Sequence, residues 1–291
     1  MNAQPQLRRR AEAAASRLPP LLARAEQLAN TVLLGDHGRR RAGAGDDFWQ
    51  YRPLQEGDSF RMIDWRRSAR TEAQFVRQKE WQIAQSVSLW VDGSASMSYA
   101  SDKALPPKSD RAQLLALALS ILLIRAGERV GLAGTDLPPR RGDGQIWRLC
   151  EALLAQGEGD YGVPEARSMI PRSRALFVSD FMGDIDALEL AMAKAADRGV
   201  RGVLLQVLDP AEEAFPFRGR AIFESMGATL EHETRKANDL RDRYLERLSV
   251  RRDHLQSLAQ ATGWQFTTHL TDAPVQQALL WLYRAMEGGG R

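Results

Sequence analysis

The sequence has little cysteine: Cys150 is the single cysteine among its 291 residues. A single cysteine excludes an intramolecular disulfide and any zinc site built on several thiolates. It lies in the apolar stretch 146–154, where we expect a buried thiol rather than the alternative, a catalytic nucleophile. A chain of this length can bury a large core without crosslinks. We therefore expect a protein of a reducing compartment, the cytoplasm.

Long apolar runs and targeting signals are also missing. No stretch reaches the roughly 18 uninterrupted apolar residues of a membrane span, and the longest candidate, residues 114–124, has the length of one core helix. Residues 1–10 are basic but precede no apolar segment of the kind found in secretory signals. We expect no transmembrane segment and no export.

Signatures of common enzymes are missing as well. The sequence has no phosphate-binding P-loop, no Gly-x-Gly-x-x-Gly between a strand and a helix, and no Gly-x-Ser-x-Gly elbow. Its four histidines do not pair at metal-ligand spacing, and only His269, near a predicted strand end, could serve a serine nucleophile as a base. We predict a protein that is not an enzyme and has no small-molecule substrate.

Positive charge is concentrated near the N-terminus. The net charge is +3, and residues 1–45 hold eight arginines against three acidic residues, which leaves +5 there and about −2 in the remainder. This distribution confines any nucleic-acid contact to residues 1–45. No RNA-binding aromatic motif or helix-turn-helix spacing accompanies these arginines, so we interpret them as a solvated face and do not expect nucleic acid as a partner.

Changes in composition divide the chain into four segments. Residues 1–45 predict a helical arm, interrupted at Pro19-Pro20, and a loop rich in arginine and glycine. Residues 46–84 are rich in arginine and aromatic residues and contain a predicted strand over 74–81. Residues 85–286 form the main predicted domain, and residues 287–291 a flexible tail.

From residue 86 onward, short apolar strands alternate with helices. The pattern predicts strands over 87–91, 130–134, 175–179, 200–207 and 264–268, and helices over 110–127, 144–156, 184–197, 235–261 and 272–286. Asp110 is the expected N-cap of the first helix. This alternation predicts an α/β fold with a mostly parallel sheet and helices on both faces. Ligands of such sheets bind beyond the carboxyl ends of the strands.

The first of these strands continues into Asp92-Gly93-Ser94-Ala95-Ser96. A carboxylate followed at i+2 and i+4 by hydroxyls can aim three oxygens at one point, and hard divalent cations prefer oxygen ligands. A second strand ends in Asp180, a fourth donor. The alternative is a capped loop, in which Asp92, Ser94 and Ser96 bind nearby backbone N–H groups. The position at two strand ends favours a site for Mg²⁺ or Mn²⁺.

The residues around these aspartates resemble a known group of proteins. Residues 89–97 are similar to the metal-ion-dependent adhesion site of von Willebrand factor type A domains, and Phe177-Val178-Ser179-Asp180 to the later Asp-bearing strand of that fold. Residues 48–53 and 56–70 resemble the signature of the bacterial domain-of-unknown-function 58 family, a resemblance that extends over about residues 20–285.

The resemblance implies a von Willebrand factor A-like, Rossmann-like fold and a non-enzymatic, cation-dependent adaptor. Its implied partner is a MoxR-type AAA+ ATPase or the client of one. Type A adhesion sites usually add a threonine from a later loop, but the corresponding residues 157–164 contain none, and Asp160 is the weaker substitute. The alternative function is a metal-dependent, phosphatase-like hydrolase that uses Asp92 and Asp180.

A charged cluster lies within the family signature. Its members are Asp58, Arg61, Asp64, Arg66, Arg67 and Arg70. Their proximity allows two interpretations: a docking face or anion site, or a network of Arg–carboxylate pairs that holds the small β segment in place. We favour the structural network.

Overall fold

The structure is a computed structural model, and it describes residues 19–32, 48–54, 63–69, 74–79, 84–155, 159–165, 169–217, 221–224, 231–234 and 237–287. The chain divides into two compact units. The larger unit combines residues 1–35 with residues 85–291, and the smaller one comprises residues 36–84.

The smaller unit contains an antiparallel pair of strands and one short helix. Strand β1 (Phe48–Pro53) pairs with β2 (Phe75–Lys79), and α2 spans Trp65–Ser68. The Ser68 side chain joins the helix to the pair, because its Oγ donates to the Asp64 carbonyl at 2.8 Å and accepts the Phe75 N–H at 2.9 Å. The predicted strand over 74–81 corresponds to β2.

The larger unit is built on a six-stranded sheet, which confirms the prediction of an α/β fold with a mostly parallel sheet. Its strand order is β10-β7-β6-β3-β4-β5. The strands are β3 (Ser86–Val91), β4 (Arg129–Leu132), β5 (Leu137–Arg140), β6 (Arg174–Ser179), β7 (Arg201–Leu208) and β10 (Gln265–Leu270). All neighbours are parallel except the edge strand β5, which is antiparallel to β4.

Strand β5 was not predicted from the sequence, because its residues are Leu-Pro-Pro-Arg. Proline has no N–H for a central ladder, but an edge strand tolerates it. Close pairing with β5 also requires Gly131 on β4, since a Cβ there would lie 2.5 Å from the Pro139 nitrogen.

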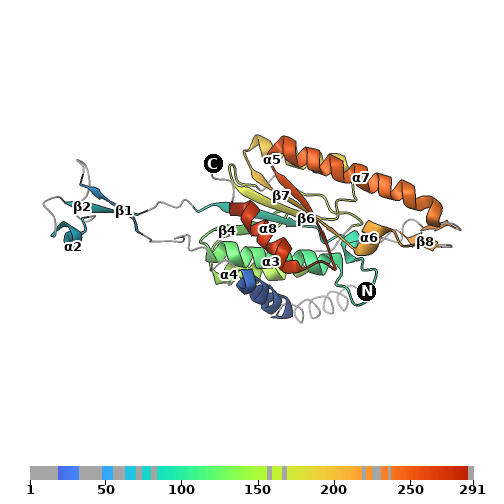
Figure 1. Cartoon of the computed structure of the whole chain (residues 1–291), viewed down its shortest axis with the longest axis horizontal. Coiled ribbons are helices and arrows are strands. Elements are labelled where there is room, and N and C mark those ends of the chain that lie inside the picture. The colour runs from blue at the N-terminus through green and yellow to red at the C-terminus, as the bar shows by residue number, and fades with distance from the viewer. Residues whose placement is uncertain are drawn as a thin grey trace, which may run out of the picture. The chain divides into compact units, whose positions relative to one another are not determined.

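Helices cover both faces of the sheet (Figure 1). On one face, a helix over residues 19–32 packs with α3 (Lys108–Arg125), α4 (Asp143–Ala155) and α8 (Val275–Glu287) in one apolar core. On the other, α5 (Ile185–Asp197) and α7 (Ala237–Thr262) pack over a second core. None of the described helices is long and apolar enough to cross a membrane.

The two cores follow from the alternation of side chains along the strands. On β3, Leu89 and Val91 belong to the first core, whereas Trp90 belongs to the second. Helix α3 has little polar face because residues 112–124 are all buried. It begins at Lys108 and not, as predicted, after an Asp110 N-cap; Asp110 lies in its first turn.

Shorter elements complete the carboxyl edge of the sheet. A 3₁₀ turn, η2 (Ala95–Ser98), follows β3, and α6 (Pro210–Ala214) follows β7. The strands β8 (Ala221–Glu224) and β9 (Glu231–Thr234) form an antiparallel pair before α7.

Candidate functional site

Three neighbouring parallel strands end in an aspartate. Asp92 follows β3, Asp180 follows β6 and Asp209 follows β7. Their residues are 2%, 1% and 0% exposed. Because β7, β6 and β3 are adjacent, the three carboxylates belong to one edge of the sheet, where ligands of open α/β folds bind. Asp209 was missed as a site residue, although it lies two positions beyond the predicted strand over 200–207.

The Asp92 carboxylate is held by hydrogen bonds alone. Its Oδ1 accepts the Ser94 N–H at 2.9 Å, and its Oδ2 accepts the Ser179 hydroxyl at 2.6 Å. The Asp92 N–H donates to the Val178 carbonyl at 2.8 Å, which fixes the start of the loop beside β6. Within the described ranges no ion pair involves Asp92.

The two serines of the motif lie side by side. The Oγ atoms of Ser94 and Ser96 are 3.3 Å apart, and both residues are buried. The capped-loop alternative holds in part, because the Asp92 side chain accepts a backbone N–H. The serine hydroxyls, however, lie within hydrogen-bonding distance of each other, and no backbone N–H of the described loop donates to them.

The segment around Asp160 closes over this motif. The Gly159 carbonyl accepts the Ala95 N–H at 2.9 Å, and the Asp160 carbonyl accepts the Ser96 N–H at 3.1 Å. A Cβ on Gly162 would lie 2.4 Å from Asp92 Oδ1. The predicted loop therefore does reach the Asp92 motif, and Asp160 contacts it through its main-chain oxygen.

Asp180 forms an ion pair that the sequence did not reveal. Lys108, 1% exposed, places its Nζ 2.8 Å from Asp180 Oδ2 and 2.6 Å from Glu212 Oε1. The other Asp180 oxygen accepts the Met182 N–H at 3.0 Å. Phe181 between them has a φ of 53°, a left-handed conformation that is strained for a bulky residue. The ion pair links the start of α3 to the ends of β6 and β7.

Glu212 is positioned by a capping box at the start of α6. Its second oxygen accepts the Asp209 N–H at 2.9 Å, and Asp209 accepts the Ala211 N–H at 2.8 Å. Asp209 also accepts the Ser101 N–H at 2.9 Å, which ties the loop after β3 to the end of β7. The capping box explains why Glu212 faces the sheet edge instead of solvent.

Burial and charge shift several pKa values at this edge. Burial opposes the charged form of Lys108, but Asp180 and Glu212 more than compensate, so the pKa of the ammonium is raised. Burial raises the pKa of Glu212, and Lys108 only partly offsets that effect. Burial and the negative field of these carboxylates also raise the pKa of Tyr161 and of Tyr99. The edge thus carries excess negative potential.

The residues considered for covalent catalysis are not suited to it. His269 lies on β10, and β7 and β6 separate that strand from the serine motif on β3. Three strand spacings amount to roughly 14 Å, and this separation argues against His269 as a base for Ser94 or Ser96. Burial lowers the pKa of His269 to about 4. Cys150 is fully buried, as expected, and burial raises its pKa to about 11.

The charged cluster of the smaller unit is described only in part. Asp58, Arg61 and Arg70 lie outside the described residues, as does the side chain of Arg67. Arg66 is exposed, and Asp64 is half-buried with its N–H donating to the Phe75 carbonyl at 2.9 Å. Asp64 thus takes part in attaching α2 to β2.

Solved structures offer only loose likenesses. The protein BatB from Bacteroides thetaiotaomicron is 16% identical, with a TM-score of 0.45, covering 71% of this chain and 100% of that one. An aerotolerance-related membrane protein from Bacteroides fragilis is 16% identical, with a TM-score of 0.44, covering 70% of this chain and 100% of that one.

Sequence relatives extend over most of the chain. The uncharacterized proteins Rv1480 of Mycobacterium tuberculosis and Mb1516 of Mycobacterium bovis are each 27% identical over 266 residues, which cover 85% of this chain and 81% of each relative. The family model described as "Protein of unknown function DUF58" matches residues 50–254. The chain therefore belongs to the DUF58 family, as its sequence motifs predict.

Proposed function

We propose that this protein is a non-enzymatic adaptor whose von Willebrand factor A-like main domain binds a divalent cation and docks on a partner protein. Mg²⁺ or Mn²⁺ would be held by Asp92, Ser94 and Ser96. The observation that carries the proposal is a carboxylate that is 2% exposed and has no ion pair within the described residues.

Charge balance is the physical argument for a cation at Asp92. A buried carboxylate without a counter-charge is costly, so such groups are paired, bound to metal or protonated. The bonds from Ser94 and Ser179 occupy one acceptor site on each Asp92 oxygen and leave further lone pairs. Together with two buried hydroxyls, the carboxylate forms the oxygen set that hard cations prefer.

No group of three His, Cys, Asp or Glu side chains that could hold a metal occurs among the described residues. The proposed site differs from such a cluster, because two of its three donors are serine hydroxyls. Protein oxygens would fill only part of an octahedral shell and leave open positions for water or for a partner's carboxylate. The cation would then contribute charge and an open coordination position, not a chemical step.

The hydrolase alternative is less well supported. Two-metal hydrolysis would need Asp180 as a second metal ligand. Lys108 already occupies Asp180 Oδ2 at 2.8 Å, and the Met182 N–H binds the other oxygen at 3.0 Å. Asp180 is better interpreted as a support that sets the electrostatic potential beside the cation.

The surroundings of the motif suit a protein partner. Tyr161 and Val163, in the segment that closes over Asp92, are 51% and 50% exposed. Aromatic residues such as tyrosine are enriched at protein–protein interfaces. The family resemblance makes a MoxR-type AAA+ ATPase, or a client of one, the first partner to test, and we place the interaction in the cytoplasm.

Thermal unfolding in the presence of metal tests the cation. At a free Mg²⁺ or Mn²⁺ concentration of 100 times Kd, binding to the folded state alone adds about 2.7 kcal/mol of stability. We expect Asp92→Asn to abolish the rise in melting temperature, and Asp136→Asn, which removes an exposed carboxylate, to retain it. An unchanged melting temperature of the wild type at millimolar metal would refute the proposed cation site.

A binding assay with the partner tests the adaptor role. The purified MoxR-type ATPase from the same organism would be immobilised, and retention of this protein measured with Mg²⁺ and with chelator. We expect retention only with Mg²⁺ and only with Asp92 intact. Equal retention in chelator would show that the partner is not held through the cation.

A further inference from the structure

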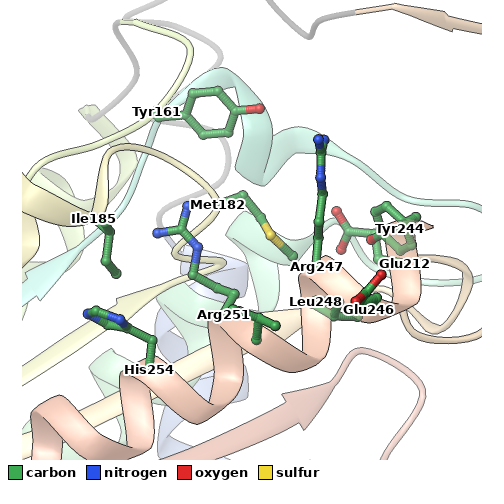
Figure 2. Close-up of a pocket in the computed structure, with 11 residues that line it drawn as sticks. Tyr161, Met182, Ile185, Glu212, Tyr244, Glu246, Arg247, Leu248, Arg251 and His254 are labelled. Carbon is green, nitrogen blue, oxygen red and sulfur yellow. The ribbon is translucent and has the colours of Figure 1, made fainter. Parts of the chain in front are cut away.

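A groove lies next to the proposed cation site, between α7 and the ends of the sheet. Its volume is about 860 Å³, and its lining combines aromatic, aliphatic and charged side chains. Tyr161 and Met182 come from the loops beyond the sheet, Glu212 comes from α6, and Arg247 and Arg251 come from α7 (Figure 2). Glu212 also forms an ion pair with Lys108, so it belongs both to the groove and to the carboxyl edge of the sheet.

Two arginines one helical turn apart give the groove its chemistry. Figure 2 shows Arg247 and Arg251 rising from the same face of α7 toward Tyr161 and Met182, as the i, i+4 spacing requires. Arg251 donates from Nη2 to the Gly183 carbonyl at 2.9 Å, while its Nη1 is buried with no hydrogen-bond partner among the described residues. Arg247 is exposed and makes no described ion pair.

An unpartnered buried N–H on a guanidinium requires an acceptor, and a carboxylate is the acceptor that guanidinium binds best. Arg251 as a whole is only half-buried and lines the groove, so its guanidinium lies beside the space that a carboxylate would occupy. Ile185, Met182 and Val250 supply apolar surface beside it, and Val250 is 62% exposed. These features suit one carboxylate flanked by apolar side chains.

We infer that this groove binds an acidic segment of a partner protein, with one carboxylate between Arg247 and Arg251 and a neighbouring apolar side chain against Met182 and Ile185. A nucleic-acid backbone fits less well, because it would place several phosphates along a lining that also holds Glu212 and Glu246, whereas the segment places one carboxylate at the arginines. The inference names the partner chemistry of the proposed docking function. It does not depend on the cation, because the ligands of the carboxylate are arginines.

A peptide titration of the full-length protein tests this assignment. The probes are two peptides, one with the core Leu-Glu-Leu-Glu-Leu and one with Leu-Gln-Leu-Gln-Leu, added in the presence of chelator. Binding is followed by the NMR signal of the Met182 methyl group and by the arginine Nε–H signals. We expect the glutamate peptide to shift Met182, and the glutamine peptide to bind at least about tenfold more weakly, as expected for loss of a charge-assisted pair.

Matched variants separate the groove from the fold and from the cation site. Arg247→Gln removes an exposed side chain without a described partner and should weaken the glutamate peptide about tenfold. Arg241→Gln, exposed on the same helix and outside the groove, should leave binding unchanged. Arg251→Lys keeps the charge and tests the forked geometry, and it should also weaken binding.

Three results would overturn the inference: no shift of Met182, equal binding of the two peptides, or equal binding by wild type and Arg247→Gln. Tighter binding of a twelve-residue oligothymidylate than of the glutamate peptide would likewise assign the groove to nucleic acid and overturn it. Arginine-dependent peptide binding that persists in Asp92→Asn and in chelator supports the groove even where the metal titration fails. The two proposals therefore fail by different measurements.

Discussion

Replacing Lys108 with methionine removes the only cation that the described structure pairs with Asp180 and Glu212. Methionine keeps most of the apolar stem, so the main loss is the ammonium, held 2.8 Å and 2.6 Å from the two carboxylates. Asp180 would then be a buried charge with no counter-charge. Removing one partner of a buried ion pair costs about 3–5 kcal/mol. We expect the free energy of unfolding to fall by about that amount.

For a unit of this size, such a loss corresponds to a fall in melting temperature of roughly 6–20 °C. Urea unfolding at pH 7.5, followed by tryptophan fluorescence, measures the free energy. Because the pKa of Lys108 is raised, its contribution is fully present below its ordinary value and is lost only at still more alkaline pH. The assay at pH 7.5 therefore reports the charged pair.

Two further variants make this measurement decisive. Lys103→Met removes an exposed lysine and should change the free energy by no more than about 0.5 kcal/mol. The triple change Lys108→Met, Asp180→Asn and Glu212→Gln removes all three charges and should recover most of the loss, because no buried charge is left unpaired. A loss below about 1 kcal/mol for Lys108→Met, or a triple variant no more stable than the single one, would refute this account of the ion pair.

Two further substitutions probe the loop over the site and the pH dependence of folding. Gly162→Ala would bring a Cβ within 2.4 Å of Asp92 Oδ1, so we expect the free energy of unfolding to fall by about 1–3 kcal/mol and the metal-induced rise in melting temperature to become smaller. Gly144→Ala, which has open space around it, should show neither effect in the same thermal unfolding assay. His269 has a folded pKa of about 4 against an ordinary 6.5, so the unfolded chain binds more protons between these values and stability should fall by about 3 kcal/mol as pH drops from 6.5 to 4. His269→Gln should make that fall shallower in urea unfolding at several pH values, and identical pH profiles would contradict the assignment.

The fold was predictable because its determinants are local. Apolar strands of five to eight residues alternate with helices, and this alternation indicates a parallel sheet that is covered on both faces. The end of β3 at Asp92 and that of β6 at Asp180 follow from the switch between apolar and polar residues. Strand β5 could not be predicted from the local pattern. Its two prolines argue against a strand unless the strand is known to lie at the edge of the sheet.

The site was predictable only where strand ends determine it. The candidate residues lie at or just beyond the ends of two strands: Asp92, Ser94 and Ser96 after β3, and Asp180 after β6. Because these parallel strands are adjacent, their carboxyl ends lie close together. Glu212 and Lys108 are different, since each depends on a contact across more than 70 positions of sequence: Lys108 meets Asp180 at a separation of 72 and Glu212 at 104. From sequence alone, a lysine in the first turn of an apolar helix is interpreted as a solvated residue.

The position of Lys108 is unfavourable for a lysine on two local grounds. A cation in the first turn of a helix opposes the helix dipole, and a lysine is among the residues least often fully buried. Lys108 occupies such a position on α3 at 1% exposure, so only its tertiary partners account for it. A residue that breaks local rules in favour of a distant cluster of charges is typical of a functional site. One ammonium cannot balance Asp92, Asp180 and Glu212 together. In the proposed function, a divalent cation beside Asp92 would supply the counter-charge that Lys108 supplies beside Asp180.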